Sequence, residues 1–303
     1  MTKPLLAPSR PFSPAPSRSA ADAGMLLVTL IWGGNFAIMK VGLTAMAPLA
    51  YTGLRFLLAC GLLWAVLKWR EGRVALPPGL LWPMMVLGVL GNTVYQIGFT
   101  LALSMSTATN CALIISTMPA VVATLGHVTG IEPTTPKMRW GIAIATAGVA
   151  LVVAARGVAF DATTLRGDLL AITSTFVWAA YTLGLRKLPA TISPLAVTAH
   201  TTFTGTPGLV LAGLPGMLSV DWAAVPAVAW GSMVYASIFS LGVAYLIWNA
   251  SVVRVGSSRT AIYMCITPMV AALVAWAVLG ERPLPLQGIG AVLIVGGVLL
   301  TRR

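Results

Sequence analysis

Pro48-Leu49-Ala50-Tyr51-Thr52 occurs a second time, almost unchanged, as Pro194-Leu195-Ala196-Val197-Thr198. The same displacement places Trp32 on Trp178, and later positions match with a displacement three residues longer. Self-similarity over such a distance predicts two structural units of similar fold.

The composition indicates which solvent these units occupy. Apolar residues make up 58% of the chain and charged residues 9%, whereas about a quarter of a soluble protein is charged. A membrane-spanning helix needs about 20 largely apolar residues. We therefore expect an all-α polytopic membrane protein with ten transmembrane helices, at about 24–43, 48–69, 81–103, 108–130, 138–155, 168–186, 194–216, 226–248, 257–279 and 285–301.

Ten spans divide into two units of five, at residues 23–156 and 157–303. Because five is odd, the second unit must enter the membrane from the opposite side, which predicts two inverted five-helix repeats, an arrangement typical of secondary transporters. Residues 1–22 are rich in Pro, Ser and Ala, and we expect them to form a disordered cytoplasmic tail.

The basic residues predict the orientation. With the N-terminus inside, fourteen Lys and Arg fall on the cytoplasmic side and four on the outer side, and basic loops stay cytoplasmic. Both termini are therefore expected in the cytoplasm. The net charge of +12 is explained by this topology and by anionic lipid head groups, so a nucleic-acid partner is not expected.

The sequence lacks the motifs that several classes of function require. The chain has no phosphate-binding loop for ATP hydrolysis, so transport would be secondary or passive. Its seven acidic residues fall in the tail, in loops or at span ends, and with two histidines they form no catalytic constellation, so an enzyme is not expected. Cys60, Cys111 and Cys265 match no metal-binding spacing. We expect neither a metal nor a cofactor.

Arg55 is the strongest candidate for a substrate-binding residue. It stands about two turns inside the second span, where a charge is costly unless it faces protein or water. A guanidinium holds a carboxylate through two parallel hydrogen bonds. A structural ion pair or a side chain that reaches back to the membrane surface is the alternative.

Other polar and aromatic side chains within the spans form a second set of candidates for the pathway. Contacts between helices, or an aromatic belt at the lipid head groups, would also explain part of this set. Four of its members on the third span are expected to share one helical face because of their spacing. The set comprises Trp32, Asn35, Asn92, Tyr95, Gln96, Phe99, Trp178, Tyr181, Tyr245, Asn249 and Tyr263.

His200 lies inside the seventh span and is a candidate for lining the pathway or for coupling transport to protons, since it must find a partner there. Pro119 and Pro268 fall in the middle of the fourth and ninth spans. Proline kinks a helix because it lacks an N–H group and its ring clashes with the preceding turn. Equivalent kinks suggest hinges or gates, although static bends remain the alternative.

These residues carry a family resemblance. Trp32-Gly33-x-Asn35 followed by Lys40, the repeated Pro-Leu-Ala-x-Thr, the mid-span prolines and Gly280-Glu281-Arg282-Pro283 resemble the EamA-type branch of the drug/metabolite transporter superfamily. The resemblance covers about residues 24–301 and implies a ten-helix carrier of the bacterial inner membrane with a central cavity. Similar members export amino acids, other metabolites or toxic organic cations.

The leading hypothesis is a secondary exporter of small metabolites, chiefly amino acids with large or aromatic side chains, which works by alternating access and as a monomer. Arg55 would bind the carboxylate. A multidrug exporter of organic cations is the alternative within carriers, and the absence of a buried acidic group argues against it. A passive channel and a lipid-handling protein are the alternatives outside that class.

Overall fold

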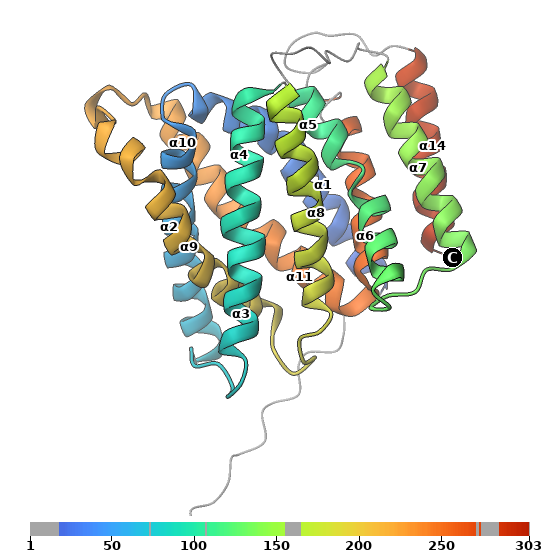
Figure 1. The fold of residues 1–303 in the computed structure, drawn as a ribbon, viewed down its shortest axis with the longest axis horizontal. Coiled ribbons are helices and arrows are strands. Elements are labelled where there is room, and N and C mark those ends of the chain that lie inside the picture. The colour runs from blue at the N-terminus through green and yellow to red at the C-terminus, as the bar shows by residue number, and fades with distance from the viewer. Residues whose placement is uncertain are drawn as a thin grey trace, which may run out of the picture.

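The computed structural model describes residues 18–72, 74–106, 108–154, 165–270, 273 and 285–302, and the regular structure within them is helical (Figure 1). Helical segments occupy the described part of every expected span. In chain order they are α1 (Arg18–Leu43), α2 (Pro48–Glu71), α3 (Leu81–Gly88), η1 (Val89–Val94), α4 (Tyr95–Met105), α5 (Ala108–Ile115), α6 (Met118–Val128), α7 (Pro136–Ala154), α8 (Leu165–Leu185), α9 (Pro194–Ser219), η2 (Trp222–Ala224), α10 (Ala227–Tyr235), η3 (Ala236–Ala244), α11 (Tyr245–Val255), α12 (Ser257–Ala261), η4 (Ile262–Ile266) and α14 (Pro285–Arg302).

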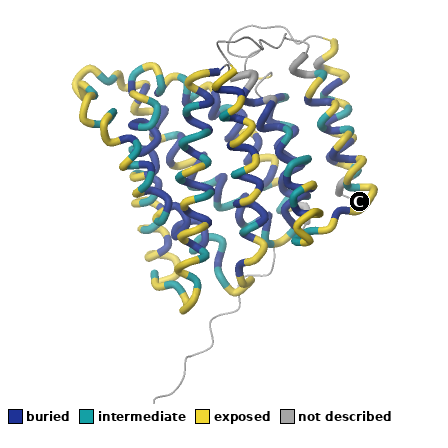
Figure 2. The backbone as a smooth tube through the Cα atoms, viewed as in Figure 1, coloured by how far each residue is buried: buried dark blue, intermediate teal, exposed yellow. Residues whose placement is uncertain are grey.

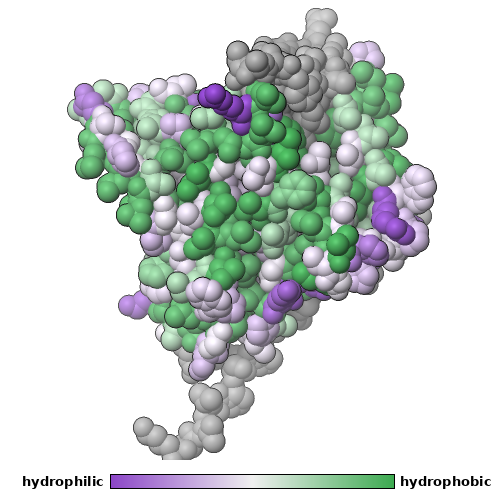
Figure 3. Space-filling model, viewed as in Figure 1, coloured by the Kyte–Doolittle hydropathy of each residue, from purple (hydrophilic) through white to green (hydrophobic). Residues whose placement is uncertain are grey.

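The surface of the bundle is apolar where a bilayer would contact it. Large hydrophobic side chains such as Leu57, Phe176, Leu211 and Val292 are exposed, and in Figure 3 hydrophobic residues cover the middle of the visible face while hydrophilic residues lie toward its edges. An exposed apolar surface of this extent marks a membrane-facing protein.

Five continuous helical stretches in the described part of the chain are long and apolar enough to cross a membrane: Ala20–Leu43, Pro48–Glu71, Leu81–Met105, Leu165–Leu185 and Ala227–Val255. The prediction of an all-helical, multi-span membrane protein is therefore confirmed. The eighth expected span ends seven residues later than predicted, at Val255, and the next residue is Gly256, whose φ of 101° is a backbone conformation that suits glycine.

Helices α7 and α14 lie side by side at one edge of the bundle (Figure 1). They meet through glycines: a Cβ atom on Gly148 would stand 2.6 Å from the carbonyl oxygen of Gly290, and one on Gly297 would stand 2.5 Å from that of Gly141. Only glycine permits such an approach of two backbones. Gly141, the earlier glycine of α7, approaches Gly297, the later glycine of α14, so the two helices run antiparallel.

The two mid-span prolines follow breaks in the α-helix rather than kinks within it. In the fourth span α5 ends at Ile115, and Pro119 lies in the first turn of α6, where a missing N–H group costs nothing. A proline at 119 leaves the carbonyl of Ile115 without its helical partner, which explains why the first helix ends there. In the ninth span Pro268 follows the 3-10 helix η4.

The third and eighth spans share a different irregularity. Each contains a π-helix, η1 in one and η3 in the other, and each π-helix is followed directly by a tyrosine, Tyr95 or Tyr245, that begins the next α-helix. Short π-helices often lie at functional sites. Buried positions line the inside of the bundle around these segments, as Figure 2 shows.

Candidate substrate cavity

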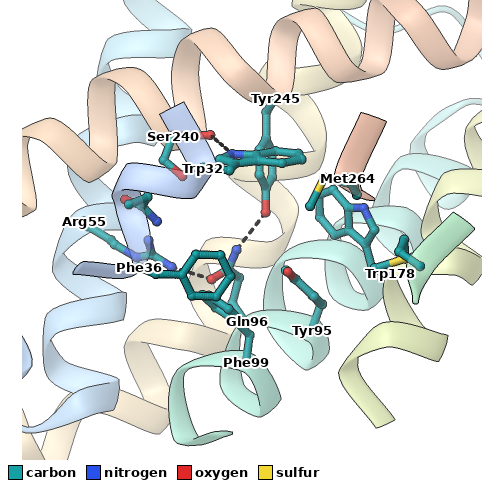
Figure 4. Close-up of a pocket in the computed structure, with 12 residues that line it drawn as sticks. Trp32, Phe36, Arg55, Tyr95, Gln96, Phe99, Trp178, Ser240, Tyr245 and Met264 are labelled. Carbon is teal, nitrogen blue, oxygen red and sulfur yellow. Dashed lines mark hydrogen bonds between the residues drawn. The ribbon is translucent and has the colours of Figure 1, made fainter. Parts of the chain in front are cut away.

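A small cavity lies in the interior of the bundle, between the first and second halves of the chain (Figure 4). Its volume is about 40 Å³, enough for a few water molecules at about 10–15 Å³ each. A substrate of amino-acid size therefore requires side chains or helices to move. The lining residues are Trp32, Asn35, Phe36, Arg55, Tyr95, Gln96, Phe99, Met118, Trp178, Ser240, Tyr245 and Met264.

Arg55 contributes the charge of the cavity. Helix α2 buries it to 1% exposure, and its Nη2 donates to Gln96 Oε1 while its Nη1 donates to Met39 Sδ at 3.3 Å. Its Nε atom is buried without a partner. No carboxylate among the described residues lies within ion-pair distance of this guanidinium. Within the described part of the chain, only neutral groups therefore contact the buried positive charge.

Gln96 connects Arg55 to the second half of the chain. Its Oε1 accepts from Arg55, and its Nε2 donates to the hydroxyl oxygen of Tyr245 at 2.7 Å (Figure 4). These two partners fix the orientation of the amide, because Arg55 can only donate. The hydroxyl of Tyr245 accepts from Gln96, so its own proton remains available to a further acceptor.

Aromatic rings form the rest of the wall. Trp32 meets Trp178 edge-to-face at 5.9 Å and Tyr245 at 6.0 Å, while Tyr95 stacks on Phe99 at 5.7 Å. Such pairs hold one another in fixed orientations and present apolar faces. The Trp32 indole donates to the carbonyl of Ser240 at 3.2 Å, which fixes its ring. The arrangement can receive a large apolar side chain beside a bound anion.

The structure brings together eight of the thirteen substrate-binding candidates found in the sequence. They are Trp32, Asn35, Arg55, Tyr95, Gln96, Phe99, Trp178 and Tyr245. The other five lie outside the cavity lining. They are Asn92, Tyr181, His200, Asn249 and Tyr263.

Asn92 belongs to the same span as Tyr95, Gln96 and Phe99 but stands outside the cavity lining. It lies within the π-helix η1 and is fully buried. Its Cβ atom faces Gly205 of α9 instead.

The remaining four have partners that tie helices together. Tyr181 donates to Asn249 Oδ1 at 3.0 Å, and Asn249 Nδ2 donates to a threonine of α9. Tyr263 donates to Asp22 near the start of α1. His200 places its ring nitrogens 2.7 Å and 2.9 Å from the carbonyl oxygens of Ala196 and Val74. These contacts are structural in the described conformation.

Four lining residues were absent from the sequence-based candidates: Phe36, Met118, Ser240 and Met264. Phe36 follows Trp32 by four residues and so shares its helical face, which is a signal that could have revealed it. Met118 lies at the start of α6, Ser240 in the π-helix η3 and Met264 in the 3-10 helix η4. Sequence periodicity gives no sign of those.

One end of the bundle is closed by a contact that we call the Glu132 clasp. Glu132 accepts from the backbone N–H groups of Ser257 and Ser258 at 2.7 Å and 3.0 Å. Arg186 places its Nε 3.8 Å from Glu132 and donates to two carbonyls at the end of α11. The clasp thereby joins the ends of α8 and α11 to the start of α12.

At the other end of α8, Lys40 donates to the carbonyl of Ser106 at 3.1 Å, and the Ser106 hydroxyl donates to Asp168. Trp178 lies between these two contacts along α8. Polar contacts therefore lie toward both ends of the helix that carries Trp178. No group of metal-binding side chains occurs within the described ranges.

Comparison with known families and proteins gives a consistent result. The model of the EamA-like transporter family matches residues 19–154 and, a second time, residues 165–303. A transporter of Archaeoglobus fulgidus, described as uncharacterized, is 32% identical over 283 residues, which are 91% of this chain and 95% of that protein.

Two relatives carry names that mention amino acids. A probable terminal-alkyne amino-acid exporter of Streptantibioticus cattleyicolor is 27% identical over 94% of both chains. A probable amino-acid metabolite efflux pump of Escherichia coli is 26% identical over 91% of this chain and 92% of that protein. A protein of known crystal structure shares the fold with a TM-score of 0.76 at 21% identity, covering 94% of this chain and 98% of the other.

Proposed function

Since this chain belongs to the EamA-like transporter family and is a membrane transporter rather than an enzyme, we propose that it exports amino acids with large or aromatic side chains. Transport is secondary and proceeds by alternating access of two inverted halves around the central cavity. The observation that carries the substrate class is Arg55, a buried guanidinium in an aromatic cavity with no carboxylate beside it among the described residues.

A buried charge without a counter-ion is costly, and a protein retains one where a ligand supplies the opposite charge. Nε of Arg55 is free, and the hydroxyl proton of Tyr245 is available in the same cavity. A substrate carboxylate can accept from both groups. The rings of Trp32, Trp178 and Phe99 would then contact the substrate side chain.

The same charge argues against the multidrug alternative. An organic cation would enter a cavity in which Arg55 is the only charged residue among the lining residues that the structure describes, and repulsion would oppose its binding. A zwitterionic amino acid carries its own carboxylate, so it offsets the guanidinium.

Inversion of the halves is supported by the α7–α14 contact. In the repeat, Gly141 corresponds to Gly290 and Gly148 corresponds to Gly297. Across the antiparallel pair, Gly141 approaches Gly297 and Gly148 approaches Gly290. This exchange of equivalent residues is what a two-fold axis between inverted halves produces. We place both termini in the cytoplasm from the distribution of basic residues.

Alternating access is supported by the polar contacts toward the two ends of α8. A cavity of about 40 Å³ in the interior of the bundle, with a polar contact toward each end of α8, fits a carrier that opens one side at a time, and it disfavours a continuous channel. The breaks before Pro119 and Pro268 are the places where we expect helices to bend during that exchange.

The test is counterflow of labelled amino acids in proteoliposomes, with Arg55→Ala compared with the native chain. Arg70→Ala is the matched control, because Arg70 lies on the same helix and is exposed. Saturable counterflow that is lost with Arg55→Ala and kept with Arg70→Ala supports the proposal. Exchange of organic cations but not amino acids would establish the multidrug function, and flux that neither saturates nor exchanges would establish a channel.

A further inference from the structure

Asn35 presents an unused hydrogen-bond acceptor to the cavity. It lies on α1, one turn after Trp32, and lines the cavity at 5% exposure. Its Oδ1 atom is buried without a partner. Buried polar atoms are nearly always hydrogen-bonded, so an orphan in a binding cavity points to a partner that the ligand brings.

The orientation of the Asn35 amide identifies the free atom as the oxygen. Nδ2 donates to the sulfur of Met39 at 3.1 Å, which is a favourable though weak contact. Turning the amide over would set an oxygen against that sulfur, and neither atom carries a proton to share. Oδ1 therefore remains the atom that is free to accept from a ligand.

Met39 also links this acceptor to the proposed carboxylate site. Its sulfur accepts from Asn35 Nδ2 and from Arg55 Nη1 at 3.3 Å. Asn35 and Arg55 are thus held against the same atom, which keeps the free acceptor and the guanidinium close together. Both residues also line the cavity, so a head group bound there would lie near both.

We propose that Asn35 Oδ1 accepts a hydrogen bond from the substituent on the carbon next to the substrate carboxylate, so that the site selects 2-amino acids and, less strongly, 2-hydroxy acids. This rests on the proposed function, because Arg55 must hold the carboxylate. An ammonium or hydroxyl group donates to Oδ1. A 2-oxo acid would place a second acceptor there, and a plain carboxylic acid would leave Oδ1 unpaired.

Both mismatched ligands leave a buried acceptor without a donor. The resulting loss of affinity is roughly 5- to 100-fold. An ammonium gains more than a hydroxyl because a charged donor forms the stronger hydrogen bond. The ranking is therefore 2-amino acid, then 2-hydroxy acid, then the 2-oxo acid and the unsubstituted acid.

The experiment measures inhibition of labelled phenylalanine counterflow by phenylalanine, phenyllactate, phenylpyruvate and 3-phenylpropionate, which differ only at the carbon in question. In the native chain we expect phenylpyruvate and 3-phenylpropionate to need at least about tenfold higher concentrations than phenylalanine. Inhibition by all four within about threefold of one another would overturn the inference while leaving the proposed function in place.

Asn35→Leu assigns the effect to this residue, because leucine has a similar volume and no acceptor. We expect the ratios to fall to within about threefold, through weaker binding of phenylalanine. Asn35→Thr restores an oxygen acceptor and should restore part of the preference. Native ratios in Asn35→Leu would overturn the assignment. If the native chain exchanges organic cations and not phenylalanine, the proposed function itself fails.

Discussion

Replacing Glu132 with Gln should open the clasp at the end of α8. The carboxylate accepts from the backbone N–H groups of Ser257 and Ser258, and hydrogen bonds to a charged acceptor contribute about 1.5–3 kcal/mol each. The ion pair with Arg186 is longer, at 3.8 Å, and partly exposed, so it adds only about 0–1 kcal/mol.

Glutamine keeps one acceptor oxygen and turns its NH₂ group toward the second N–H group. One charge-assisted bond is then lost and the other becomes neutral, a loss of about 2–3 kcal/mol. Opening of the clasp should become roughly 30- to 150-fold more frequent. The assay is amide hydrogen exchange, measured in nanodiscs, in the peptide that contains Ser257 and Ser258. Its exchange rate should rise as the clasp opens more often.

Glu71→Gln provides the control. Glu71 ends α2, is exposed and accepts from the hydroxyl of Ser193, so it is a helix-end carboxylate with a different partner. We expect its replacement to leave exchange at Ser257 and Ser258 unchanged. Exchange in Glu132→Gln within about twofold of the native rate would refute the reasoning, because it would mean that the carboxylate does not hold α12.

Three further predictions concern packing, the cavity and His200. Gly297→Ala should lower the free energy of unfolding by about 1–3 kcal/mol, because its Cβ would meet backbone atoms of α7, whereas Gly296→Ala, where no atom lies within 4 Å, should be neutral in thermal unfolding. Gln96→Glu should form an ion pair with Arg55 and so weaken substrate binding at least about tenfold, while Gln96→Leu should weaken it less; equal binding constants in counterflow would contradict this. His200→Gln should leave the KM for counterflow within about threefold of native, because His200 lies outside the cavity lining. It should lower the melting temperature, because the ring nitrogens lie at hydrogen-bond distance from two carbonyl oxygens and the ring N–H donates to one of them; a lost response to a pH gradient would instead show that His200 couples protons.

Seven of the eight candidates that do line the cavity, all except Phe99, were visible in the sequence for a common reason. A charged, amide or polar-aromatic side chain within an apolar span is costly in lipid, so it must face protein or a cavity. That cost is a property of the residue and its neighbours in the chain. Arg55 and Gln96 could therefore be selected without any knowledge of their partners.

Asn249 and Tyr181 carried the same signal and have a different role. They hydrogen-bond each other and α9, so the same cost is met by contacts between helices. Polar character alone does not distinguish a residue that contacts substrate from one that joins two helices, because the distinction depends on which neighbouring helix satisfies its hydrogen bonds.

The sequence by itself determined that this chain is an all-helical, multi-span membrane protein with an internal repeat, because hydropathy and self-similarity depend only on the order of residues in the chain. Only the tertiary structure decided which polar residues meet. Asn92 packs its Cβ against Gly205 of α9, the glycines bring α7 against α14, and Met39 holds Asn35 beside Arg55. Those outcomes depend on helix rotation and on contacts between residues far apart in the chain, which no local pattern encodes.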